Sequence, residues 1–167
     1  MTEYLRVSAI GLLCALLAMT LASPAFSGFK AGAEAAGRED YQTALAEWLP
    51  LAESGDERAQ YNIGLMYEYG RGVPEDQGKA FKWYRRAAEG GAVPAQHNLG
   101  TMYASGRAVA KDMVEAYKWF LVAAAAGFAL SIDALEKAPQ LISETEIEQA
   151  RTMAGEWIKN FSPEIGT

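Results

Sequence analysis

Residue types that could carry catalysis are scarce in this chain, and their spacing does not assemble a known active site. Among its 167 residues there is one His and one Cys, which leaves no metal cluster of His and Cys side chains and no disulfide framework. His97 is the one side chain that titrates near neutral pH and could serve as a general base. Ser105 follows eight residues later, but no third group orients the pair. We expect no catalytic residue, no metal and no cofactor, with a hydrolase that uses His97 as the alternative hypothesis.

The composition limits both the fold and the partner. The chain has 15 Lys and Arg against 21 Asp and Glu, a net charge of −6, and 50% hydrophobic residues. These values are typical of a folding globular chain, and the length suits one ordinary domain or two small ones. We do not expect a nucleic acid as the main partner, because binding to nucleic acids needs a basic surface.

An apolar segment at the N-terminus resembles a secretory signal. Arg6 precedes an almost unbroken apolar run over residues 7–22, which contains Cys14 and is short for a membrane-spanning helix. Small residues after the run place a cleavage site after Ser27 or after Ala25. We therefore expect a signal peptide over residues 1–27, a single domain over 28–167, and a periplasmic or secreted protein. An uncleaved membrane anchor is the alternative, and it would be the only contact with a membrane.

An internal repeat organises the rest of the chain. Residues 52–87 and 88–123 share 17 identities over 36 aligned positions, and a partial lead-in copy lies over 28–51. A repeat of this length is typical of stacked supersecondary units.

Each unit is predicted to be a helix, a turn and a second helix. The first helix has its apolar residues on one face, and Gly70 is placed to end it. Asp76 is placed to begin the second helix, and its counterpart Asp112 has Glu115 at the spacing of a capping box.

Two glycines inside the predicted first helices indicate that the adjacent helix approaches their backbone closely. Gly64 and Gly100 occupy the same repeat position, although a glycine in a helix costs about 1 kcal/mol relative to alanine. We expect small residues of the adjacent helix to face these glycines, and a Trp of each copy to fill the space between units. These residues are Ala80, Ala87 and Trp83 in the first copy, and Ala116, Ala123 and Trp119 in the second.

A closing helix is predicted over about residues 143–160. Ser143 and Glu146 have the spacing of a capping box, and apolar residues at helical spacing follow them. The helix is expected to cover Leu121 and Val122, which stand where the first copy has the Arg85–Arg86 pair. Those arginines, with Lys79 and Lys82, are expected to form a solvated basic ridge.

The repeat resembles the Sel-one-like repeat family, a relative of the tetratricopeptide repeat. The resemblance rests on AQYNIGLMY over residues 59–67, on GRGV over 70–73, on KWY over 82–84, and on their counterparts in the second copy. It implies an all-α, right-handed solenoid and a role as a protein-interaction scaffold. The second copy departs from the pattern where Ala108 and Ala110 replace Gly72 and Pro74, which weakens the prediction of a rigid turn there.

The first-helix positions that differ between the copies are candidates for a partner-binding surface, because the repeat fold does not dictate them. Solenoids usually bind partners through their inner surface, which such first-helix residues form. The predicted partner-binding residues are Tyr61, Leu65, Glu68 and Tyr69 in the first copy and His97 and Thr101 in the second. An unselected surface is the alternative interpretation of the same variability.

We therefore predict a non-catalytic scaffold of the bacterial cell envelope that binds a protein or peptide. Two alternatives remain open at this point. One is an envelope hydrolase using His97, and the other is a structural component of a larger envelope assembly.

Overall fold

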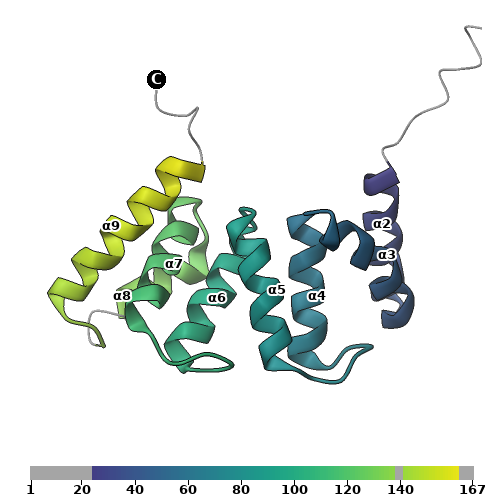
Figure 1. The fold of residues 1–167 in the computed structure, drawn as a ribbon, viewed down its shortest axis with the longest axis horizontal. Coiled ribbons are helices and arrows are strands. Elements are labelled where there is room, and N and C mark those ends of the chain that lie inside the picture. Colours follow the sequence, from purple (N-terminus) through teal and green to yellow (C-terminus); the bar gives the residue numbers. More distant parts are fainter. Residues whose placement is uncertain (1–23, 138–140, 162–167) are drawn as a thin grey trace, which may run out of the picture.

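The computed structural model describes residues 24–137 and 141–161, and this part of the chain forms eight helices and no strand. Figure 1 shows the helices side by side in chain order, from α2 and α3 at one end to α8 and α9 at the other. Their bounds are α2 Pro24–Gly37, α3 Tyr41–Glu53, α4 Glu57–Tyr69, α5 Gln77–Glu89, α6 Val93–Ser105, α7 Met113–Ala125, α8 Ala129–Lys137 and α9 Glu144–Phe161. The predicted all-α solenoid of helix–turn–helix units is confirmed.

The helix ends follow from local hydrogen bonding. Asp76 caps α5 by accepting a hydrogen bond from the Lys79 amide at 2.9 Å, and Gly70 ends α4 in the left-handed region at φ 64°. Asp112 caps α7 in the same way. The predicted capping box of Asp112 and Glu115 is only half formed, because the Glu115 carboxylate lies against Lys118 Nζ at 3.2 Å.

The turn of the second copy keeps its shape without glycine. Ala108 has φ 64°, close to the φ of 72° at its counterpart Gly72. A non-glycine residue in this left-handed region costs roughly 1–2 kcal/mol. The rest of the repeat therefore holds Ala108 in a conformation that its own side chain disfavours.

The close approach at the helical glycines is confirmed, and the nearest side chain at each of them is an aromatic ring. A Cβ added at Gly64 would lie 2.6 Å from the Tyr84 ring, and one at Gly100 would lie 2.7 Å from the Phe120 ring. Ala80 is wholly buried, as expected, but it is not among the nearest atoms to Gly64. Its counterpart Ala116 does face Gly100, because its carbonyl oxygen would lie 3.1 Å from an added Cβ. Each helix pair thus packs a flat ring of its second helix against the bare backbone of its first.

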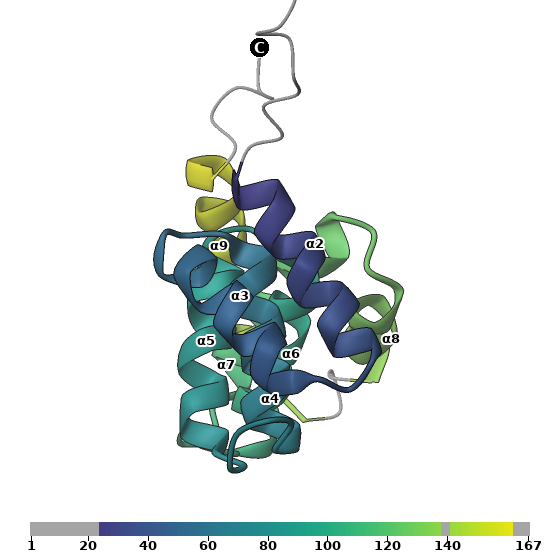
Figure 2. The ribbon, with the colours of Figure 1, turned by 90° about the vertical axis from the view of Figure 1, so that its right-hand side faces the viewer.

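The core extends between the helix pairs. Trp83 packs against a cluster built from α2, α3 and α4, and Trp119 lies against Trp157 of α9 with 5.6 Å between the ring centroids. Both predicted tryptophans therefore fill space between elements. Figure 2, which looks along the row of helices, shows α2 and α3 lying across the end of this core.

Both ends of the solenoid contain additional helices. The pair α2 and α3 stands where the partial lead-in copy was predicted, and α9 stands where the closing helix was predicted. The capping box at its start is formed, because the Ser143 amide donates to Glu146 Oε2 at 2.9 Å and the Glu146 amide donates to Ser143 Oγ at 3.4 Å. Helix α8 was not predicted.

The residues that differ at the end of the second copy are explained by α9. This helix packs on α7 and leaves Val122 only 3% exposed, with Leu121 half-buried. The corresponding Arg85 and Arg86 of α5 are exposed. The expected exchange of arginines for apolar residues beneath a closing helix is confirmed.

Most of the predicted signal peptide lies outside the described residues. Helix α2 begins at Pro24, so the expected cleavage sites after Ala25 and Ser27 fall in its first turn. Among the helices that the structure describes, none combines the length and apolar character needed to cross a bilayer.

The glycine contact gives a direct stability prediction. Gly64→Ala should lower the free energy of unfolding by about 1–3 kcal/mol, because the added methyl group overlaps the buried Tyr84 ring. The matched control is Gly155→Ala in α9, where an added Cβ meets nothing within 4 Å, so the gain in helix propensity should raise stability by up to about 1 kcal/mol. Urea unfolding of both variants measures this difference, and equal effects of the two substitutions would contradict the proposed contact.

Candidate partner-binding site

The predicted partner-binding residues lie on two first helices, α4 and α6, but they differ widely in exposure. Tyr69 is 58% exposed, whereas Tyr61, Leu65 and Thr101 are half-buried. The α4 residues form the more apolar part of this row. Tyr69 therefore offers the largest accessible side chain among the predicted set.

Tyr61 of α4 forms an aromatic pair with Tyr84 of α5. Its ring lies 5.8 Å from the Tyr84 ring, centroid to centroid. Burial raises the pKa of Tyr61 above its ordinary value, and the neighbouring Tyr69 and Glu68 act in the same direction. The phenol therefore stays protonated at neutral pH and can donate a hydrogen bond to a partner.

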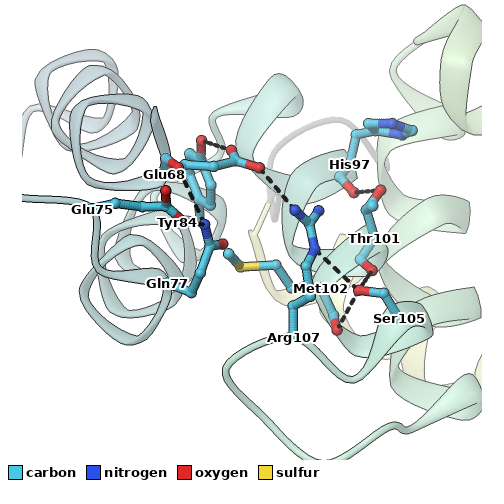
Figure 3. Close-up of polar contacts among 9 residues, drawn as sticks. All are labelled: Glu68, Glu75, Gln77, Tyr84, His97, Thr101, Met102, Ser105 and Arg107. Carbon is cyan, nitrogen blue, oxygen red and sulfur yellow. Dashed lines mark hydrogen bonds and ion pairs between the residues drawn. The ribbon is translucent and has the colours of Figure 1, made fainter. Parts of the chain in front are cut away.

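Glu68 is committed to contacts inside the protein. Its carboxylate accepts a hydrogen bond from Tyr84 Oη at 2.5 Å and lies 3.5 Å from Arg107 Nη1, and its side chain is only 10% exposed (Figure 3). Burial raises the pKa of Tyr84 well above its ordinary range, and the bond to Glu68 adds to this shift. Glu68 therefore joins α4 to α5 and to the loop after α6, which leaves little of it for a partner.

His97 also serves an internal contact. Its ring packs near both Phe120 and Phe128, at centroid distances of 5.5 and 5.4 Å, and its Nδ1 is 2.9 Å from the hydroxyl of Ser131 in α8. Ser131 is completely buried. Burial lowers the pKa of His97. This contact connects α6 to α8.

The hydroxyl groups of α6 are bonded along their own helix. Thr101 Oγ1 donates to the His97 carbonyl at 3.1 Å, and Ser105 Oγ donates to the Thr101 carbonyl at 2.8 Å (Figure 3). The hydroxyl that does meet His97 belongs to Ser131, which is inaccessible to a substrate. This geometry lacks the exposed nucleophile that a hydrolase with His97 as its base would need. In residues 24–137 and 141–161, no group of three or more His, Cys, Asp or Glu side chains is arranged to hold a metal ion.

Sequence reasoning missed the internal partners of these residues, although the two copies contained a signal for one of them. In the first copy, Tyr84 of α5 is matched by Glu68 of α4. At the equivalent positions of the second copy, α7 has Phe120, which lacks a hydroxyl, and α6 has Ala104. The acid is present only in the copy whose ring has a hydroxyl to bond. No comparable signal pointed to Ser131, because its partner His97 lies 34 positions away in a different helix pair.

A comparison with known protein families finds two repeats in the part of the chain where the sequence repeats itself. A sequence model of the Sel1 repeat matches residues 57–91 and again residues 93–128. These two matches contain α4 with α5 and α6 with α7.

Two solved structures share both the fold and part of the sequence. A Sel1 repeat protein from Oxalobacter formigenes is 36% identical, with a TM-score of 0.63 over 70% of this chain and 95% of that one. A protective antigen of uropathogenic Escherichia coli that displays an SLR fold is 28% identical, with a TM-score of 0.77 over 84% of this chain and 31% of that one.

Two curated relatives match over shorter stretches. The DAP3-binding cell death enhancer 1 of Rattus norvegicus is 46% identical over 41 residues, and the chitin synthase regulator SKT5 of Saccharomyces cerevisiae is 38% identical over 56 residues. The matched stretch spans 8% of the length of each of them. The sequence similarity to these relatives is therefore confined to that stretch.

The repeat motif in two copies, the helix pairs that it forms and the solved relative matched over nearly its whole length all agree. Proteins of this kind are generally protein-interaction scaffolds without catalytic function. The chain belongs to the Sel1 repeat family.

Proposed function

We propose that this protein is a non-catalytic scaffold of the bacterial cell envelope and that it binds a protein or peptide through the first-helix row of α4 and α6. The observation that carries the proposal is the accessible apolar surface of α4. Tyr69 is 58% exposed, and Leu65 lies beside it one turn earlier on the helix. Aromatic side chains are frequent anchors of protein interfaces.

The binding surface is narrower than the sequence suggested. Glu68 and His97 are held by Tyr84 and Ser131, so their substitution would disturb the fold before it disturbed a contact with a partner. Tyr61, Leu65, Tyr69 and Thr101 remain as contact residues. Glu68 and His97 act by holding α4 and α6 in place.

The envelope location rests on the sequence. The apolar run over residues 7–22, followed by small residues up to Ser27, supports export. The protective antigen of uropathogenic Escherichia coli shares the fold. We therefore place the partner among proteins or peptides of the envelope.

Site-specific photo-cross-linking in intact cells tests the binding surface. A photoreactive residue at position 69 should give a discrete adduct in the envelope fraction, and Leu65→Thr in the same chain should reduce its yield about tenfold, as for an interface anchor. Leu65→Thr copies Thr101, which the second repeat accepts at the same position.

The matched control places the photoreactive residue at Leu130 of α8, which is 60% exposed and lies outside the row. The proposal fails if position 69 gives no adduct, or if both positions give the same adducts with equal yield.

The burial of His97 predicts a pH dependence of stability. Since burial lowers the pKa of His97 in the folded protein, the unfolded chain binds more protons below its ordinary pKa of about 6.5. Stability should therefore be greatest above that pH, fall as the pH decreases through it, and level off below the folded pKa. His97 is the only histidine, so His97→Gln should remove this component while retaining a donor for Ser131.

Urea unfolding of both proteins between pH 5 and pH 8 measures the difference. Identical pH profiles would mean that His97 is solvated in the folded state.

A further inference from the structure

A basic hollow on α5 is separate from the first-helix row. It has a volume of about 360 Å³ and is lined by residues of this one helix: Lys79, Lys82, Trp83, Arg85 and Arg86. Four of these five residues are cationic, in a chain whose net charge is −6. The hollow therefore concentrates positive charge on a protein that is acidic overall.

The positive charges of the hollow are available to an incoming anion. Lys79 Nζ lies 3.5 Å from Asp76 Oδ2, and Arg85 Nε lies 3.8 Å from Glu89 Oε1. Both pairs are exposed, so they contribute little to stability and exchange readily. Among the described residues, Lys82 has no carboxylate oxygen within 4.0 Å.

The base of the hollow is fixed. The Arg86 guanidinium lies over the Trp83 ring, 4.7 Å from its centroid, and donates a hydrogen bond to the Ala52 carbonyl of α3 at 3.2 Å. Trp83 is half-buried and packs against the core of α2, α3 and α4. A ligand would therefore meet a preformed surface that is both apolar and cationic.

The second repeat shows that the fold does not require this feature. At the corresponding positions α7 has Glu115, Lys118, Leu121 and Val122. Lys118 is paired with Glu115 at 3.2 Å, and Val122 is buried beneath α9. The basic hollow is thus a property of α5 and not of the repeat.

We propose that this hollow binds a short, extended acidic segment of a partner protein, with carboxylates on Lys82 and Arg85 and an apolar side chain against Trp83. The cations follow one helix from position 79 to position 86, a rise of about 10 Å. Three or four residues of an extended peptide cover that length. The narrow line of charge favours a peptide over a membrane or a nucleic acid, because the acidic remainder of the protein would repel a broad polyanion.

Fluorescence anisotropy with a labelled peptide tests the proposal. The probe is the hexapeptide Glu-Asp-Leu-Glu-Asp-Glu with a dye at its N-terminus, titrated with the full chain at about 0.1 M salt, where charges more than about 10 Å apart are largely screened. It should bind, and the amide analogue with Gln and Asn in place of the acids should not. The double substitution Lys82→Gln with Arg85→Gln should weaken binding about tenfold or more, because it removes two facing charges.

The matched control is Arg151→Gln with Lys159→Gln in α9, which removes the same net charge from exposed positions outside the hollow. It should change the affinity by less than about twofold, since distant charges are screened. Equal weakening by both double substitutions would overturn the proposal, as would failure of the acidic peptide to bind.

Vesicles with and without phosphatidylglycerol test whether the hollow binds an anionic membrane surface and not a peptide. The protein could bind the anionic vesicles and not the peptide, and the Lys82 and Arg85 substitutions could abolish the vesicle binding. That result would assign the hollow to a membrane surface and overturn the peptide proposal. Thermal unfolding of each variant accompanies the titrations. If the double substitution lowers the midpoint, Lys82→Gln alone supplies the comparison.

Discussion

The contact between an aromatic ring and a bare helical backbone is the constraint on which this structure depends. In both complete repeats the first helix has a glycine where the second helix places a ring, Gly64 under Tyr84 and Gly100 under Phe120. The missing Cβ lets the two helices approach closely. Because the contact recurs after 36 residues, each repeat is built with the same internal spacing and can stack on the next.

The same contact organises the surfaces. Since the Tyr84 ring is fixed against Gly64, its hydroxyl reaches Glu68, and Glu68 then meets Arg107 from the following repeat. The first-helix side chains that remain outside this contact form the proposed binding row. A separate surface lies on α5, where exposed cations and the half-buried Trp83 line the basic hollow. The solenoid therefore presents two chemically different surfaces, one apolar and aromatic on its first helices and the other cationic on α5.

The sequence predicted the repeated elements well, because their signals are local or recur in register. The glycine that ends α4, the aspartate that begins α5 and the capping box of α9 all lie within a few residues of the group that they bond. Contacts between distant residues were harder to predict. Alanines were expected to face the helical glycines, but the nearest side chains are the rings of Tyr84 and Phe120. Hydrophobic periodicity shows which residues share a helix face, but it does not show which of them lies against the neighbouring helix.

In the candidate site, too, local features could be predicted from the sequence and contacts between distant residues could not. Exposure of Tyr69 could be predicted from its position off the packing face, and it is exposed. The internal roles of Glu68 and His97 could not be read from variability alone, because a variable residue can match a variable internal partner. Helix α8 was missed because it lacks the repeat motif, and its Ser131 is tied to the fold through His97.

A double-mutant cycle between Gly100 and Phe120 tests the central contact most directly. It compares the free energies of unfolding of Gly100→Ala, Phe120→Leu and the combined variant with that of the unaltered protein. If the ring lies against the glycine backbone, Phe120→Leu should make room for the added methyl group. The combined loss should then be smaller than the sum of the single losses by more than about 0.5 kcal/mol. Additive losses would mean that residues 100 and 120 do not meet, and would contradict the packing rule proposed for the whole solenoid.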